Sequence, residues 1–214
     1  MTIRAKLYVA ILLTVLGPVI TVAVALHGMG RLGDRFDEVQ ERADQRALAL
    51  GLKFDVTDFN GWQTAYGYDD GASRPRFERS VKQFRADYAA VRKELTDAHE
   101  TRLLDGLRTR FDQFMALDDV AYAALQRGDE ARVKQIFLGP ELRLFDQMAS
   151  RSEELASYEA RGATATEKAF DNAREDSRRA LIAVGLGAAL VIVLLLVTAG
   201  DIARLAIEGH RVRR

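Results

Sequence analysis

The sequence predicts an all-α protein, an up-down-up-down four-helix bundle whose first and last helices continue into two transmembrane helices. Two observations lead to this prediction. Apolar residues in the middle of the chain recur at steps of three and four, and almost no segment alternates with the period of two that a strand requires. Residues 7–26 and 180–199 contain no charged residue, and a helix of about 20 residues just crosses the roughly 30 Å hydrocarbon layer of a bilayer.

The two uncharged stretches divide the chain into five segments. We expect a cytoplasmic tip (1–6), a first transmembrane helix (7–27), an extracytoplasmic sensor domain (28–179), a second transmembrane helix (180–199) and the cytoplasmic start of a linker (200–214). The short ends are locally basic, so the positive-inside rule places them in the cytoplasm, on one side of an inner or plasma membrane: Arg4, Lys6, Arg204, Arg211, Arg213 and Arg214. The sequence Ala-Val-Ala at 23–25 leaves open that the first stretch is a cleaved signal peptide.

The first bundle helix is predicted from about residue 30 to residue 70. Its apolar residues follow steps of three and four, and we expect them to face the bundle interior: Leu32, Phe36, Val39, Ala43, Leu50 and Phe54. The segment "DDGASRPR" then ends the helix, because Gly71 suits the position after a helix end and Pro75 fits the first turn of the next helix. The chain has no cysteine, so packing alone must stabilise the domain.

The second and third helices have the most regular apolar faces. The second shows the four-three alternation of coiled-coil packing: Phe77, Val81, Phe84, Tyr88, Val91 and Leu95. The third follows Thr96 and Asp97, which can serve as caps, and its inward face holds Leu103 or Leu104, Leu107, Phe111, Phe114, Ala121 and Leu125. After an interruption at 126–140, the fourth helix begins near Pro140. Its inward face starts with Leu142, Phe145 and Met148, and it continues without a breaker into the second uncharged stretch.

This layout resembles the ligand-binding half of bacterial methyl-accepting chemotaxis proteins that have a four-helix-bundle sensor. The segment "IFLGPELRLFDQM" at 136–148 resembles the start of the fourth sensor helix, and "DFNGWQTAYGYD" at 58–69 resembles a segment of actinobacterial members. The resemblance implies a homodimeric chemotaxis receptor that detects a small molecule or partner outside the membrane. It also implies a HAMP-like linker from residue 200, although 200–214 lacks the proline usual there, and cytoplasmic signalling partners reached through an output domain beyond residue 214.

Two other functions stay open at this point. The chain can be the sensor part of a histidine kinase, which shares the same layout. Alternatively, it can be a non-sensing membrane-anchored module whose helices only dimerise or dock another protein.

The sequence carries no motif for catalysis or cofactor binding. Glycine-rich nucleotide loops and nucleophile elbows are absent, and His27, His99 and His210 lie far apart, so we expect no enzyme, no metal site and no cofactor. Adjacent carboxylates such as Asp118 and Asp119 point to different faces of a helix, and we interpret them as solvated surface. Acidic residues match the basic ones in number, which predicts no nucleic-acid partner. The basic C-terminal end favours contact with membrane lipid headgroups.

One stretch of the first helix stands out as a candidate ligand site. Past Leu50 and Phe54, the predicted inward face becomes small and polar, and a second line of larger residues runs beside it. A small seam next to amphipathic aromatic walls can leave room for a ligand. The predicted ligand-binding residues are Asp55, Asp58, Phe59, Gly61, Trp62, Ala65 and Tyr66.

The same stretch has a purely structural interpretation. Gly61 and Ala65 can let a neighbouring helix approach closely, with Trp62, the only tryptophan, filling the end of the core. Receptors of the resembled family that sense amino acids bind the ligand carboxylate with arginines, whereas this stretch is rich in aspartate. If a small molecule binds here, the composition favours a cationic or aromatic one.

Overall fold

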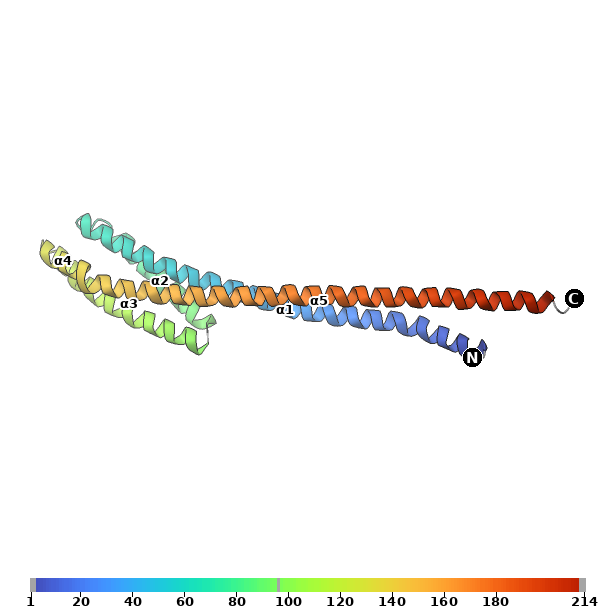
Figure 1. Ribbon diagram of the computed structural model, residues 1–214. Helices are drawn as coiled ribbons and strands as arrows, with labels where there is room; N and C mark the ends of the chain where they lie inside the picture. The colour runs from blue at the N-terminus through green and yellow to red at the C-terminus, as the bar shows by residue number, and fades with distance from the viewer. Residues whose placement is uncertain (1–2, 96, 212–214) are drawn as a thin grey trace. The chain divides into compact units, whose positions relative to one another are not determined.

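The computed structural model describes residues 3–95 and 97–211, with the side chains of residues 8, 12, 14–95, 97–197, 199 and 200. These residues form helices joined by short turns (Figure 1): α1 (Ile3–Tyr68), α2 (Arg74–Glu94), α3 (Ala98–Leu125), α4 (Glu130–Ile136), the π-helical segment η1 (Phe137–Glu141) and α5 (Leu142–Arg211). No strand occurs within the described residues. The all-α class predicted from the sequence is confirmed.

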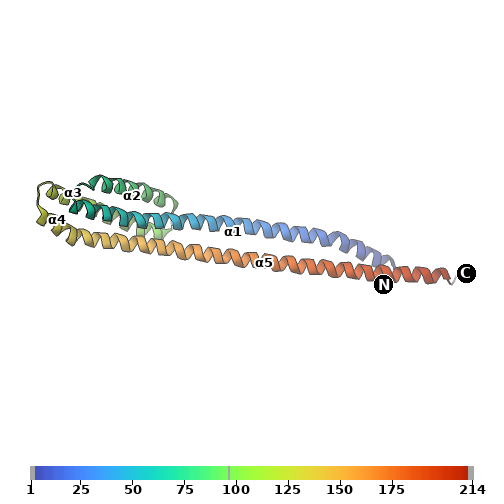
Figure 2. The ribbon, with the colours of Figure 1, turned by 90° about the horizontal axis from the view of Figure 1, so that it is seen from above.

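The chain divides into two units. Unit 1 comprises Met1–Asp37 and Glu167–Arg214, and unit 2 comprises Glu38–Thr166. Within unit 1, the parts of α1 and α5 run alongside each other in opposite directions (Figure 2). Within unit 2, α1, α2, α3 and α5 all contribute buried side chains to one apolar core.

The apolar stretches of unit 1 are exposed. One helix within Thr14–Tyr68 and one within Glu130–Val197 are each long and apolar enough to cross a membrane. The core helix of a soluble protein would bury its large side chains, but here they lie on the outside, as lipid-facing side chains do: Leu16, Val19, Ile20, Leu26, Leu186, Leu190, Ile192 and Leu196. Unit 1 therefore holds two candidate membrane-spanning segments.

Phe59 of α1 lies at the centre of the unit 2 core. Its ring packs edge-on against Phe84 of α2 and against Phe111 and Phe114 of α3, with centroid distances of 5.3, 5.7 and 5.4 Å. All four rings are fully buried. Each aromatic pair of this kind contributes about 0.5–1.5 kcal/mol beyond the burial of its area. The faces predicted for the second and third helices are confirmed, because their members are buried or half-buried.

Backbone geometry and hydrogen bonds explain where α1 ends and where α2 and α3 begin. Asp70 and Gly71 have positive φ values of 55° and 89°, and Gly71 N–H donates to the Tyr66 carbonyl at 2.8 Å, which closes the end of α1. Pro75 lies in the first turn of α2, as predicted. Asp97 caps α3 by accepting from His99 N–H at 2.6 Å. Thr96, the other predicted cap, lies outside the described residues.

The interruption predicted at 126–140 is shorter than expected. Gly128, with φ of 73°, ends the turn after α3, and the Asp129 carboxylate caps α4 by accepting from Arg132 N–H at 3.0 Å. The chain then passes through η1 directly into α5. Pro140 lies inside η1, where its nitrogen has no hydrogen to donate to the helical ladder.

The face predicted to be buried on the first helix is wrong within unit 2. Leu50 and Phe54 are 44% and 67% exposed, and the core instead receives a neighbouring line of residues: Ala49, Leu52, Val56, Phe59, Gln63 and Tyr66. Both lines advance by three and four residues, so both satisfy the period of a helix. In the fourth helix, Leu142 is likewise exposed, at 44%.

This correction predicts unequal effects for two leucines that lie two residues apart. Leu52→Ala should lower the free energy of unfolding by about 2–5 kcal/mol because it leaves a cavity in the core, whereas Leu50→Ala should change it by about 0.5 kcal/mol. Denaturant titration of the full chain in dilute detergent solution, where subunit association contributes least, measures both values. A larger loss for Leu50→Ala would restore the face predicted from the sequence.

Candidate ligand-binding site

Asp118 of α3 is a fully buried carboxylate that α1 and α2 compensate. Arg74 Nη1 lies 2.6 Å from its Oδ2. The Tyr66 hydroxyl donates to Oδ1, and the Gln63 amide nitrogen donates to the same atom at 3.0 Å. A buried carboxyl group without hydrogen-bond partners is strongly unfavourable, so these donors compensate the burial of Asp118. Burial and the nearby Asp118 charge raise the pKa of Tyr66, so its hydroxyl remains a donor.

Three aromatic rings surround the Arg74 guanidinium. Its central carbon lies 5.1 Å from the Tyr66 ring centroid, 4.7 Å from that of Phe77 and 4.4 Å from that of Tyr122. Arg74 Nε also donates to Glu78 at 3.1 Å. The guanidinium is therefore occupied by two carboxylates and three rings, and α2 is held to α3 at its first residue.

Glu141, the last residue of η1, is a second buried carboxyl group beside Asp118 and is less well compensated. It is 1% exposed; its Oε1 accepts from Gln63 Nε2, and its Oε2 has no hydrogen-bond partner. Burial raises the pKa of Glu141 to about 8, an effect that the Gln63 hydrogen bond and Arg74 oppose and the Asp118 charge reinforces. Glu141 therefore carries a proton for most of the time at neutral pH. We call Gln63, Tyr66, Arg74, Asp118 and Glu141 the Asp118 cluster.

A cavity of about 450 Å³ adjoins the Asp118 cluster, and we call it the α1–α4 cavity. It lies within unit 2 and is lined from α1, α3, α4, η1, the first residue of α5 and the turn after α1: Asn60, Gln63, Thr64, Gly67, Tyr68, Asp70, Leu125, Glu130, Val133, Lys134, Phe137, Leu138 and Leu142. Gln63 belongs to both the wall and the cluster. Glu141 is therefore hydrogen-bonded to a residue of the cavity wall.

Gly67 explains how η1 approaches α1 so closely at this cavity. A Cβ atom at position 67 would lie 2.4 Å from Phe137 Cε2, so any larger residue would displace the Phe137 ring. That ring packs edge-on against Tyr66, with 5.9 Å between centroids. The glycine therefore lets the Phe137 ring of η1 line the cavity and pack against Tyr66.

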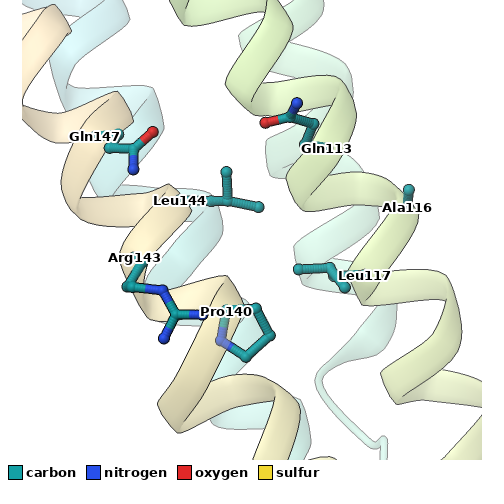
Figure 3. Close-up of a pocket in the computed structure, with 7 residues that line it drawn as sticks. All are labelled: Gln113, Ala116, Leu117, Pro140, Arg143, Leu144 and Gln147. Atoms are coloured by element: carbon teal, nitrogen blue, oxygen red, sulfur yellow. The ribbon is translucent and has the colours of Figure 1, made fainter.

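A second hollow of similar size lies on the outside of unit 2 between α3 and α5. Figure 3 shows its lining, with Leu117 and Leu144 between the two helices: Gln113, Ala116, Leu117, Pro140, Arg143, Leu144 and Gln147. Its polar side chains, Gln113, Arg143 and Gln147, are all exposed to solvent. The α1–α4 cavity differs because one wall residue connects to buried charged groups, so it is the stronger candidate for selective binding.

Three further carboxyl groups, those of Asp55, Glu100 and Glu159, are buried in unit 2 away from the cavity. Burial raises the pKa of Asp55 to about 7, and the nearby Asp87 adds to the rise. Burial also raises the pKa of Glu159 to about 7, together with the adjacent Glu100. Arg42 Nη1 lies 3.7 Å from Glu159, too far for a strong hydrogen bond.

The seven predicted site residues take different places, and none of them lines the α1–α4 cavity. Asp55, Phe59 and Tyr66 are buried, and Tyr66 alone belongs to the Asp118 cluster. Gly61 is exposed, and an added Cβ there would meet no atom within 4 Å, so the predicted small seam faces outward. The other three are half-buried: Asp58, which accepts from the Ser80 hydroxyl, Trp62, whose ring lies 4.8 Å from the Arg76 guanidinium, and Ala65.

Except for Tyr66, the residues of the Asp118 cluster were not among the predicted site residues. Asp118 was expected on the solvated surface, but it is fully buried while Asp119 is exposed. A signal was present, because position 118 continues the inward face of the third helix between Phe114 and Ala121, at steps of four and three. Gln63 likewise lies between Phe59 and Tyr66 on the inner line of α1, at steps of four and three, whereas no comparable signal marks Glu141.

Neither a metal centre among the described residues nor a match to a known family explains this site. Within the described residues, no three histidine or carboxylate side chains come together in a way that could hold a metal ion. No known protein family, no curated protein and no solved structure matches the chain.

The buried carboxyl groups predict an unusual pH dependence of stability. Asp55, Glu141 and Glu159 have ordinary pKa values of 3.8, 4.5 and 4.5 that folding raises to about 7, 8 and 7. Their protonated forms suit the interior, so this part of the stability is fully present below about pH 4 and is lost as the pH rises through 7 to 8. The thermal unfolding midpoint of the full chain should fall between about pH 5 and pH 8.5.

Three amide substitutions provide the control for this prediction. Asp55→Asn, Glu141→Gln and Glu159→Gln imitate the protonated forms, so the combined variant should unfold at nearly the same temperature across that pH range. A midpoint of the unmodified chain that does not fall over this range would show that folding leaves the pKa values of these groups near their ordinary values.

Proposed function

We propose that this chain is a transmembrane signal-transduction receptor of the chemotaxis-sensor type, which detects a small molecule or partner outside the membrane. One observation carries the proposal. The α1–α4 cavity is lined by Leu142, the first residue of α5, and α5 extends through the uncharged stretch 180–199 to Arg211. A ligand in the cavity would therefore contact the same helix that is proposed to cross the membrane.

Unit 1 supports the membrane part of this proposal. Its exposed apolar side chains are suited to lipid, and the basic ends of the chain favour a cytoplasmic location for both termini. Unit 2 then lies outside the cytoplasm as a four-helix-bundle sensor. The basic C-terminal end, whose side chains lie outside the described residues, is proposed to contact anionic lipid headgroups.

Signal transmission is proposed to occur by a displacement of α5. Shifts of about 1–2 Å along or about a packed helix are typical of such transitions. A ligand next to η1 changes the contacts that hold the beginning of α5 against α1, and the Asp118 cluster links that point to α2 and α3 as well. The energy available for signalling is the difference in ligand affinity between the two helix positions.

An exposed stripe on α1 supports assembly into a homodimer. Within unit 2, nine positions follow strict steps of three and four, carry no charge and are exposed: Gln40, Ala43, Ala47, Leu50, Phe54, Thr57, Gly61, Thr64 and Tyr68. This spacing is that of a coiled-coil seam. We propose that two copies pair in parallel along this uncharged α1 stripe, which would bury Phe54 and Tyr68, now 67% and 84% exposed.

The same stripe also favours the second candidate, a non-sensing dimerisation or docking module, because such a module needs the stripe and not the cavity. The sensor part of a histidine kinase would use the cavity as the chemotaxis receptor does and would differ only in its output domain. Signalling through a substitute output domain separates the receptor proposals from the docking module.

A hybrid receptor tests the proposed function. Residues 1–214 are fused to the kinase-controlling cytoplasmic part of a well-characterised chemoreceptor, with linker lengths that cover one helical turn, about 3.6 residues. At least one hybrid should change its kinase activity more than about twofold when the external pH steps from about 5 to 8 or when amines, amino acids or aromatic acids are added, because these stimuli act on the cavity or on Glu141. Kinase assays in membrane vesicles give the measurement.

Cysteine labelling provides the control for insertion. Lys82 is exposed on α2, so a cysteine there, in a chain that has none, should react with an impermeant thiol reagent on intact cells. An inserted and labelled hybrid whose kinase activity never responds at any linker length would leave the docking module as the better explanation.

The proposed dimer predicts a specific crosslinking pattern. Ala47→Cys should form an intermolecular disulfide rapidly under mild oxidation, because seam residues of a parallel pair face their own copies. Lys82→Cys, equally exposed but on α2, should crosslink far more slowly. Non-reducing gel electrophoresis of membranes measures both rates. Equal rates would rule out pairing along the uncharged α1 stripe.

A further inference from the structure

We propose that the α1–α4 cavity binds an organic ammonium ion with a small apolar body, whose nitrogen is received by the Gln63–Glu141 pair. The proposal rests on the receptor function above and names the class of ligand. It follows from three properties of the described residues: which hydrogen-bonding groups are free, which charges line the cavity, and how its apolar wall is built.

When Glu141 is ionised, the groups that the Gln63–Glu141 pair can offer a ligand are acceptors. Gln63 Nε2 has two hydrogens, and both are used, one toward Asp118 and one toward Glu141. Gln63 can therefore offer a ligand only its carbonyl oxygen. Glu141, which is hydrogen-bonded to Gln63, has a second oxygen, Oε2, without a partner, and this oxygen is an acceptor once Glu141 is ionised. A ligand that donates hydrogen bonds satisfies these atoms, and one that only accepts does not.

The charges of the lining also favour a cation. Asp70 and Glu130 contribute two carboxylates, and Lys134 is the one cationic side chain in the lining as described. Arg74 belongs to the Asp118 cluster, but Asp118 and Glu78 occupy its guanidinium, so it is not available to an anionic ligand. An ammonium ion gains attraction from the wall, whereas a carboxylate finds only Lys134.

The rest of the cavity is suited to an apolar group of limited size. Its apolar lining comes from four elements: Leu125, Val133, Phe137, Leu138 and Leu142. A volume of about 450 Å³ holds a molecule of the size of one aromatic ring with a short side chain. The Phe137 ring, positioned by Gly67, provides an aromatic wall for such a group.

Binding of an ammonium ion should be coupled to the ionisation of Glu141. The charged and titratable groups that face Glu141 are Tyr66 from α1, Arg74 from α2 and Asp118 from α3, and Arg74 is already paired with Asp118. A cation beside Glu141 offsets the unfavourable ionisation of that carboxyl, so binding should release a proton. Affinity should therefore rise as the pH increases toward the pKa of about 8.

Three probes of one shape test the ligand class. Isothermal titration calorimetry of the purified full chain in detergent compares 2-phenylethylamine, which is cationic, with the neutral 2-phenylethanol and the anionic phenylacetate. We expect the amine to bind at least about tenfold more tightly than either analogue, and about tenfold more tightly near pH 8 than near pH 6.

Substitutions locate the site and separate binding from folding. Glu141→Gln should weaken amine binding about tenfold to a hundredfold and remove its pH dependence. Glu159→Gln, a matched change at a buried carboxyl outside the cavity, should leave binding unchanged. Lys134→Gln removes the positive charge of the lining at an exposed position and should make amine binding severalfold tighter.

The outcomes distinguish this proposal from the receptor function. Binding of the alcohol or the carboxylate as tightly as the amine, or an amine affinity that neither Glu141→Gln nor Lys134→Gln alters, would overturn the ammonium site. Amine binding to the purified chain that follows the expected pattern, combined with hybrids that never respond, would retain the site and reject the receptor.

Discussion

The constraint on which unit 2 depends is the compensation of one buried charge, that of Asp118. A lone carboxylate in the interior is unfavourable by several kcal/mol, so α1 and α2 must each place hydrogen-bond donors next to Asp118 of α3. Tyr66 and Gln63 come from the last turns of α1, and Arg74 is the first residue of α2. The turn between these helices must therefore be short and fixed, which the left-handed backbone at Gly71 permits.

The same constraint explains why Glu141 is the sensitive point of the cluster. Arg74 and Tyr66 are directed at Asp118, and Gln63 divides its two hydrogens between the carboxyl groups, so Glu141 receives a single hydrogen bond. It remains neutral unless the pH rises or a cation approaches. Because Glu141 immediately precedes α5, a change in its charge acts directly on the beginning of the helix that leads toward unit 1. The chemistry of the site and the connection of the chain thus support the same function.

Sequence periodicity predicted the all-α class and the core-facing sides of α2 and α3, because each of these two helices has one apolar line flanked by charges. It failed on α1, where Leu50 and Phe54 form an outer line and Leu52 belongs to an inner one; the period alone does not say which line meets the core. The candidate site was harder to predict. Asp118 was visible only as a polar residue at a core position, and Glu141 becomes significant through contacts with residues far away in the sequence.

The uncharged α1 stripe and the α1–α4 cavity are not independent features. Thr64 and Tyr68 belong to both, since they lie on the exposed stripe and also line the cavity. A second copy packed along the stripe would cover part of the cavity rim, so pairing and ligand binding would each change the free energy of the other by the same amount. The proposed receptor would then need no separate pathway between its ligand and its partner. The end of α1 would respond both to pairing and to ligand binding. Gln63, which lines the cavity and donates to Glu141, would connect these changes to the beginning of α5.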